Sequence, residues 1–160
     1  MKLLVLFAVL CLSAFVSTQI TDVPIRSVGV QGVLLCGKQP AEGVKIRLFR
    51  TKTDDLKEML AYKTTGSDGS FTLEGNTVGR PVNETDLIPT VRFYHNCDED
   101  PKKAKGYRTF ILNIPKDFIT LGRIPRNVYK VGTLNLQVIF PKEAREKNFK
   151  ESATKTLLKK

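Results

Sequence analysis

The amino-acid sequence predicts an all-β protein, an antiparallel β-sandwich of about seven to eight strands. Three observations lead to this fold class: apolar residues recur at every second position, the apolar segments are short, and turn residues separate them. No amphipathic helix is available for the crossovers that an α/β layout needs. The chain has 160 residues, a length that suits one domain, so a single sandwich is expected.

Seven segments are predicted to be strands. In chain order they are residues 28–36, 44–51, 59–65, 70–73, 89–96, 107–114 and 131–140. The second shows the alternation clearly, because Val44, Ile46 and Leu48 alternate with Lys45 and Arg47. One face of each strand is therefore expected to be buried and the other to face water.

Turn chemistry predicts the connections. Between the third and fourth predicted strands lies Gly66-Ser67-Asp68-Gly69, where Asp-Gly supplies the positive φ of a tight hairpin turn. Residues 115–120, PKDFIT, place a proline at the first position of a turn of helix, so one short helix is compatible with the sequence there. After Pro141 the alternation stops. The sequence EAREKNFKESATKTLLKK is either a frayed charged helix or, as favoured here, a tail without fixed structure.

The N-terminus predicts a cleaved secretory signal. Met1-Lys2 is followed by LLVLFAVLCL, an apolar run too short to span a bilayer, and then by small and polar residues. Cleavage is expected near Thr18, with Ser17 and Ala14 as alternatives, and a buried N-terminal strand or helix is the competing interpretation. The predicted organisation is a signal peptide at 1–18, a β-sandwich domain at 19–141 and a basic, flexible tail at 142–160. The mature protein is expected to be secreted, extracellular and without a transmembrane segment.

Compartment determines how the cysteines are interpreted. Cys11 leaves with the signal, so Cys36 and Cys97 remain together in an oxidising compartment, where a structural disulfide is the default. Two free buried thiols are the alternative. No metal site is expected, because two cysteines and the single His95 are too few for a closed zinc shell.

The chain is basic, with a formal net charge of +10 at pH 7. In a secreted protein this balance points to anionic partners, such as phospholipid head groups, sulfated glycans or acidic proteins, more than to nucleic acid. A solvated surface kept soluble by its charge is the alternative. The predicted contact surface combines the lysine-rich tail with Lys102, Lys103, Lys105 and Arg108.

Two loop motifs are also noted. Asn83-Glu84-Thr85 is an N-glycosylation sequon in a polar loop, so Asn83 is a candidate for modification in an exported chain. The acidic run at residues 98–100 offers oxygen ligands for calcium, but it lacks a glycine-punctuated loop, so a solvated loop is favoured.

Longer motifs carry a resemblance over nearly the whole mature chain. They are GVLLCGKQPAEGVKIRLF, TTGSDGSFTLEG, IPTVRFYHNCDED and YKVGTLNLQVIFP. With these motifs the chain resembles the nematode transthyretin-like family, whose secreted domains have a transthyretin-like, immunoglobulin-like β-sandwich. Many members carry two further cysteines that this chain lacks, which fits pairing of Cys36 with Cys97. The resemblance implies an extracellular binding or adaptor protein, because some members are similar to secreted bridging factors that recognise anionic phospholipid on dying cells and present it to a receptor.

An enzyme and a carrier are the alternatives that the resemblance raises. Hydroxyisourate hydrolases of the wider superfamily use paired histidines, an arginine and a C-terminal Tyr-Arg-Gly-Ser, whereas this chain has only His95 and ends in LLKK. We therefore expect no enzymatic activity and no cofactor, with His95 in a structural role. A carrier of small hormones or lipids is the other alternative. Lys45, Arg47 and Arg92 are expected to blunt edge strands, which favours a monomer or weak dimer over a tetramer.

Overall fold

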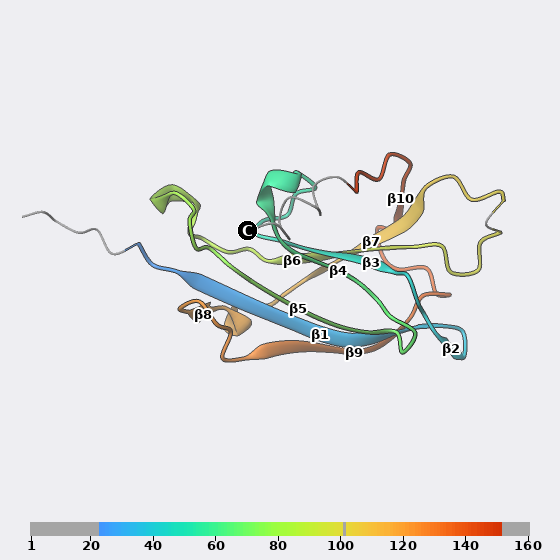
Figure 1. Ribbon diagram of the computed structural model, residues 1–160, viewed down its shortest axis with the longest axis horizontal. Helices are drawn as coiled ribbons and strands as arrows, with labels where there is room; N and C mark the ends of the chain where they lie inside the picture. The colour runs from blue at the N-terminus through green and yellow to red at the C-terminus, as the bar shows by residue number, and fades with distance from the viewer. Residues whose placement is uncertain (1–22, 101, 152–160) are drawn as a thin grey trace, which may run out of the picture.

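Two β-sheets packed face to face make up the computed structural model, which describes residues 23–100 and 102–151 (Figure 1). In the first sheet, β2 (Gln39–Pro40), β5 (Ser70–Asn76), β8 (Thr120–Leu121) and β9 (Val128–Asn135) all pair with β1 (Arg26–Cys36). The second sheet has the order β10 (Ala144–Glu146), β7 (Tyr107–Asn113), β6 (Thr90–His95), β3 (Lys45–Phe49) and β4 (Met59–Thr64). The all-β sandwich predicted from the sequence is confirmed.

Almost every strand pair is antiparallel, as predicted, but β1 and β9 are parallel. The helical content of the described residues consists of three 3₁₀ turns, η1 (Leu56–Glu58), η2 (Val82–Glu84) and η3 (Lys116–Phe118). The last of these confirms the single helical turn expected within PKDFIT. No helix in the described part of the chain is long and apolar enough to cross a membrane.

The residues between the sheets are the inward-facing members of the alternating strands. Phe93 on β6 stacks on Phe110 of β7 at 4.7 Å between ring centroids, and it meets Phe71 of β5 edge-on at 5.6 Å. Val30 and Leu34 on β1 are fully buried against this aromatic cluster. Alternation therefore predicted the core correctly, because one side of each strand faces the opposite sheet.

The predicted hairpin is wrong, although the predicted turn is present. Gly69 has φ of 67° and its N–H donates to the carbonyl of Gly66 at 3.0 Å, as the Asp-Gly pattern requires. The flanking strands belong to different sheets, because β4 pairs with β3 whereas β5 pairs with β1. The turn thus carries the chain from the second sheet to the first.

Two predicted boundaries also differ from the structure. The last predicted strand, 131–140, stops at Asn135, whose side-chain oxygen accepts the N–H groups of Gly37 and Gln137 and turns the chain out of the sheet. The segment after 141 is not a tail without structure in its described part, since β10 pairs with β7. The remainder of that predicted tail, 152–160, and the predicted signal, 1–18, lie outside the described residues.

A disulfide between Cys36 and Cys97 confirms the predicted pairing, with the two Cα atoms 5.6 Å apart. Cys36 ends β1 in the first sheet and Cys97 follows β6 in the second. The bond therefore links the two sheets at one end of the sandwich. It closes a loop of 61 residues.

Candidate functional site

Three of the four predicted anion-contact residues lie together in the loop between β6 and β7. Lys102, Lys103 and Lys105 are exposed, and we call them the lysine loop. Lys103 Nζ lies 3.9 Å from an Asp100 carboxylate oxygen, and no ion pair involves Lys102 or Lys105 among the described residues. The loop is anchored by Asp100, whose side chain accepts the Lys102 N–H at 2.9 Å. The loop between β6 and β7 lies at one end of the molecule (Figure 1), so three exposed lysines are gathered there.

Arg108, the fourth predicted contact residue, is not part of this surface. Its guanidinium binds Glu143 through two hydrogen bonds of 2.5 and 3.0 Å and also donates to the carbonyls of Cys97, Leu136 and Val138. Desolvation tends to raise the pKa of Glu143, but hydrogen bonds and the Arg108 charge outweigh it, so the pKa is lowered. Arg108 thus joins the β9 end, the 143 turn and the disulfide region, and its side chain is only 15% exposed.

The acidic run near the lysine loop is largely engaged by protein groups. Glu99 forms an ion pair with Arg145 on β10, and Asp100 caps the turn that follows it. These contacts tie the loop to the C-terminal strand. The run therefore has a structural role that the sequence pattern alone did not indicate.

His95 is buried beside the disulfide, at 2% exposure. Its Nδ1 accepts the Cys97 N–H at 3.3 Å, which places the ring proton on Nε2. Burial, with a smaller effect from the Arg108 charge, lowers the pKa of His95 to about 4, so the ring is neutral at physiological pH. The ring packs edge-on against Phe110 at 6.0 Å.

The outer face of the second sheet carries a group of cations and aromatic rings that we call the cationic face. It comprises Lys45, Arg47, Arg92, Tyr94 and Tyr107. The expectation that its basic members protect sheet edges is wrong, because β3 and β6 are central strands of the sheet. The alternation along 44–51 placed Lys45 and Arg47 on the outward face, but it gave no sign of what covers them.

The C-terminal segment, residues 147–151, covers part of the cationic face. Phe149 packs edge-on against Tyr94 at 4.8 Å and Tyr107 at 5.2 Å, and Arg47 lies 4.0 Å from the Phe149 ring centroid. Lys45 forms an ion pair with Glu151. The segment that the sequence assigned to a flexible tail is thus held by cation–π, aromatic and ionic contacts.

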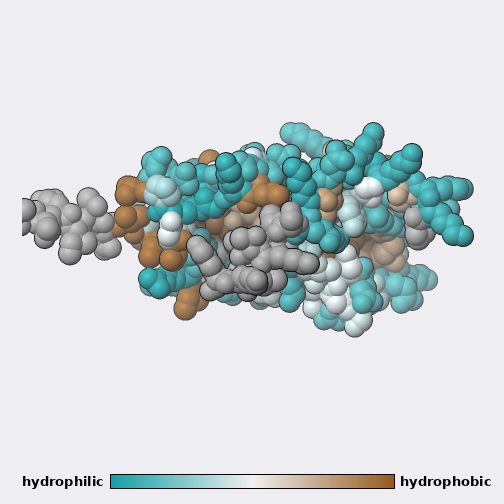
Figure 2. Space-filling view, turned by 45° about the horizontal axis from the view of Figure 1, so that its top comes forward, coloured by the Kyte–Doolittle hydropathy of each residue, from teal (hydrophilic) through white to brown (hydrophobic). Residues whose placement is uncertain are grey.

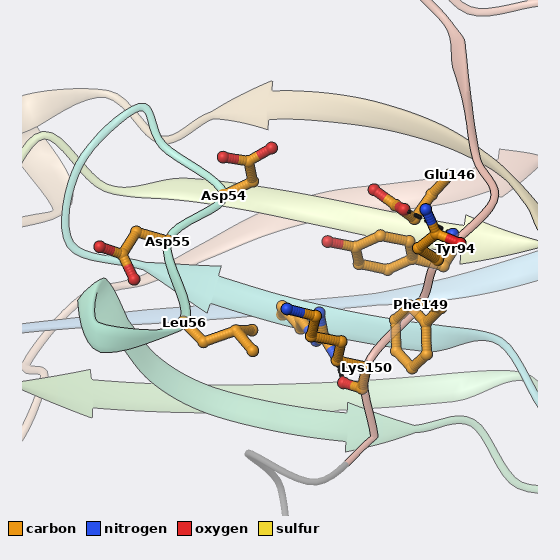
Figure 3. Close-up of a pocket in the computed structure, with 9 residues that line it drawn as sticks. Asp54, Asp55, Leu56, Tyr94, Glu146, Phe149 and Lys150 are labelled. Carbon is orange, nitrogen blue, oxygen red and sulfur yellow. Dashed lines mark hydrogen bonds between the residues drawn. The ribbon is translucent and has the colours of Figure 1, made fainter.

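A cleft of about 450 Å³ lies between this segment and the loop before η1. In Figure 3, Asp54 and Asp55 stand on one side, Phe149 and Lys150 on the other, and the Tyr94 ring lies between them with its hydroxyl toward the loop. Arg47 and Glu146 also line it. The cleft joins residues that are about one hundred positions apart, so no local motif pointed to it.

The opposite end of the sandwich carries exposed apolar side chains. Figure 2 shows hydrophobic atoms gathered at the end that carries β8, where Leu121 and Ile124 are 68% and 75% exposed.

Asn83 is exposed on η2, which satisfies the steric requirement for the predicted glycan. Modification of Asn83 stays a prediction.

Comparison with known proteins adds evidence of ancestry. A model described as the transthyretin-like family matches residues 31–115. Transthyretin-like protein 33 of Caenorhabditis elegans is 39% identical over 122 residues, covering 76% of this chain and 81% of that protein. Transthyretin-like protein 46 of the same organism is 37% identical over 122 residues, covering 76% of this chain and 65% of that protein. Transthyretin-like protein 5 is 32% identical over 147 residues, covering 91% and 98%.

Among solved structures, a 9R-lipoxygenase from Cyanothece aligns over 69% of this chain and 16% of its own length. The TM-score is 0.40 and the identity is 15%, so this likeness carries no argument.

Proposed function

This chain belongs to the transthyretin-like family, and from that premise we propose that it is a secreted, non-enzymatic binding protein whose ligand is an anionic phospholipid surface. The observation that carries the proposal is the lysine loop, which presents three exposed ammonium groups at one end of a rigid sandwich. Near an anionic membrane each such charge contributes about 1 kcal/mol, so three acting together produce measurable binding.

Neighbouring residues extend the same surface. A β-carbon at Gly106 would collide with the carbonyl of Glu146 and contact Lys147, so the C-terminal segment lies against the base of the lysine loop. Lys147 is exposed there and adds a fourth positive charge to this end. Arg108 supports the surface from beneath through Glu143 instead of contacting the ligand.

Secretion is supported by the disulfide. Such bonds persist in oxidising compartments and are rare in the cytosol. The linkage of Cys36 to Cys97 across the two sheets is therefore consistent with export through the predicted signal at 1–18.

The proposal of a non-enzymatic protein is supported by the environment of His95. A general base needs a pKa near the operating pH and reach to a substrate proton. Burial instead lowers the pKa of His95 to about 4, and the backbone N–H of Cys97 occupies Nδ1. A hydrolase that relies on two imidazoles cannot be built around this one residue.

Vesicle sedimentation tests the proposed ligand. The wild-type protein is expected to bind phosphatidylserine-containing vesicles more strongly than phosphatidylcholine vesicles, and to lose binding as salt rises, because exposed charges are screened within about 8 Å at physiological ionic strength. A variant with Lys102→Gln, Lys103→Gln and Lys105→Gln should lose most of this preference.

The matched control removes three exposed lysines elsewhere, Lys57→Gln, Lys116→Gln and Lys130→Gln, so that net charge falls equally. It should retain most of the binding. Equal losses of binding in both triple variants would show that net charge, and not the lysine loop, determines binding. Equal, salt-independent binding to both vesicle types would exclude an anionic lipid as the ligand.

A further inference from the structure

Arg47 and Arg92 lie directly opposite each other on β3 and β6. Opposed residues on one face of an antiparallel pair have β-carbons about 5 Å apart, and like charges placed this way repel. Arg47 is 4% exposed and the Arg92 side chain is 14% exposed, so little water reaches either. The pair is a concentrated positive charge on the cationic face.

Protein groups compensate this charge poorly. Across the described ranges no carboxylate forms an ion pair with Arg47, and Arg92 has only Asp54 at 3.8 Å, whose side chain is 72% exposed. Arg47 Nη2 donates to the Lys150 carbonyl at 2.5 Å, which satisfies a hydrogen bond but supplies no negative charge. The Nε atoms of both arginines are buried and have no hydrogen-bond partner in the part of the chain that the structure describes. Buried charges in proteins are normally paired, so this pair carries positive charge that an oxyanion would compensate.

Both arginines adjoin the cleft beside the C-terminal segment. Arg47 lines it directly, and Arg92 reaches its wall through Asp54. The Tyr94 hydroxyl is turned toward the 54–55 loop in Figure 3. Burial raises the pKa of Tyr94, and the positive charges of Arg92 and Arg47 oppose that rise. The cleft therefore offers the Arg47 guanidinium and the Tyr94 phenol as hydrogen-bond donors, and Arg92 adds positive charge from behind Asp54.

The rim has the opposite character. Asp54 and Asp55 stand on the loop side and Glu146 on the β10 side, with Lys150 as the one cation among the described rim residues. These carboxylates disfavour a bare polyanion and favour a positive group at the mouth. The Phe149 and Tyr94 rings add faces against which a cation can rest.

We propose that this cleft binds a small zwitterion, whose oxyanion accepts hydrogen bonds from Arg47 and Tyr94 near the charge of Arg92 and whose cationic group lies against the carboxylates of the rim. The cleft is separate from the lysine loop. If the cleft does not bind a zwitterion, the proposed membrane contact of the lysine loop is unaffected. The lysine-loop triple variant should bind the zwitterion as the wild type does.

Titration followed by NMR of the arginine Nε–Hε resonances tests the proposal. Three probes separate the charges: phosphoethanolamine carries both, inorganic phosphate only the anion, and ethanolamine only the cation. Phosphoethanolamine is expected to shift the Arg47 and Arg92 resonances saturably with a dissociation constant of about 1 mM or tighter. Phosphate should bind at least about tenfold more weakly, and ethanolamine should leave these resonances in place.

Variants locate the site. Tyr94→Phe, which keeps the ring that packs on Phe149, should weaken binding about three- to tenfold, and Arg92→Gln should weaken it through the loss of one positive charge. Arg126→Gln is the control, because this exposed side chain lies on the loop after β8 and takes part in no ion pair among the described residues. The proposal is overturned if phosphoethanolamine shifts neither resonance. It is also overturned if phosphate alone binds as tightly, or if Tyr94→Phe and Arg126→Gln behave alike.

Discussion

At the scale of the residue, basic side chains that are close together in the sequence have different roles in the structure. The side chains of the lysine loop are exposed to water. Arg108, only a few positions further along, instead donates hydrogen bonds to Glu143 and to three backbone carbonyls. Composition predicted the charge of all four. It could not predict which of them meets a carboxylate 35 positions away.

His95 illustrates the same scale through pH. Its folded pKa of about 4 is below the unfolded value near 6.5, so the unfolded chain binds the extra proton between these values. The stability that this residue contributes is therefore present above pH 6.5 and is lost as the pH falls toward 4. The loss amounts to about 3 kcal/mol at most.

We accordingly predict that the free energy of unfolding falls more steeply between pH 7 and pH 4 in the wild type than in His95→Asn. The asparagine keeps a side-chain acceptor for the Cys97 N–H but does not titrate. Urea denaturation of both proteins across this range measures the difference, which cancels carboxylates common to the two. Parallel curves would show that the pKa of His95 is the same in the folded and the unfolded chain.

At the scale of the element, local chemistry predicted most strands and turns but not their partners. Asp68-Gly69 forms the turn that its residues require, yet β4 and β5 pair in different sheets. Similarly, 144–146 has no strong strand pattern, and it becomes β10 because β7 offers an unpaired edge. Pairing is set by distant backbone donors and acceptors, which period-two alternation does not encode.

The C-terminal segment provides a test at this scale. Phe149→Ala removes the ring that contacts Tyr94, Tyr107, Lys45 and Arg47. We expect faster trypsin cleavage after Lys147 and Lys150, with a loss of about 1–3 kcal/mol in the free energy of unfolding from lost apolar burial.

Leu121→Ala, at a side chain that is 68% exposed, is the control and should change neither quantity measurably. Mass spectrometry of timed digests identifies the cleavage sites. Unchanged cleavage after Lys147 and Lys150 in Phe149→Ala would show that the contacts around Phe149 do not hold the segment.

At the scale of the whole molecule, the two sheets are joined by the aromatic core and by one covalent link. Phe71, Phe93 and Phe110 pack across the interface, and the disulfide closes the end where His95 is buried. The opposite end is left to noncovalent packing and presents exposed Leu121 and Ile124. The two ends of the sandwich therefore differ: one carries the disulfide and the lysine loop, and the other carries exposed Leu121 and Ile124.

Removal of the cross-link tests its contribution. Cys36→Ser with Cys97→Ser frees a loop of 61 residues in the unfolded chain. Loop-closure entropy predicts a loss of about 4 kcal/mol in the free energy of unfolding, as an upper value. Guanidinium denaturation of the double variant against the wild type gives this number.

The double variant avoids the unpaired thiol of a single substitution. It should keep the β-sheet circular dichroism of the parent. An undiminished denaturation midpoint would mean that the bond does not constrain the unfolded chain.

The sequence by itself determined the all-β class, the core side of each long strand, the pairing of Cys36 with Cys97 and the family, because alternation, turn residues and cysteine count are local or compositional properties. Only the tertiary structure decided that β4 and β5 part to different sheets, that Arg108 is enclosed, and that Phe149 covers an arginine pair. Each of these depends on groups far apart in the chain. Their meeting follows from how the two sheets pack, which no short stretch of residues specifies.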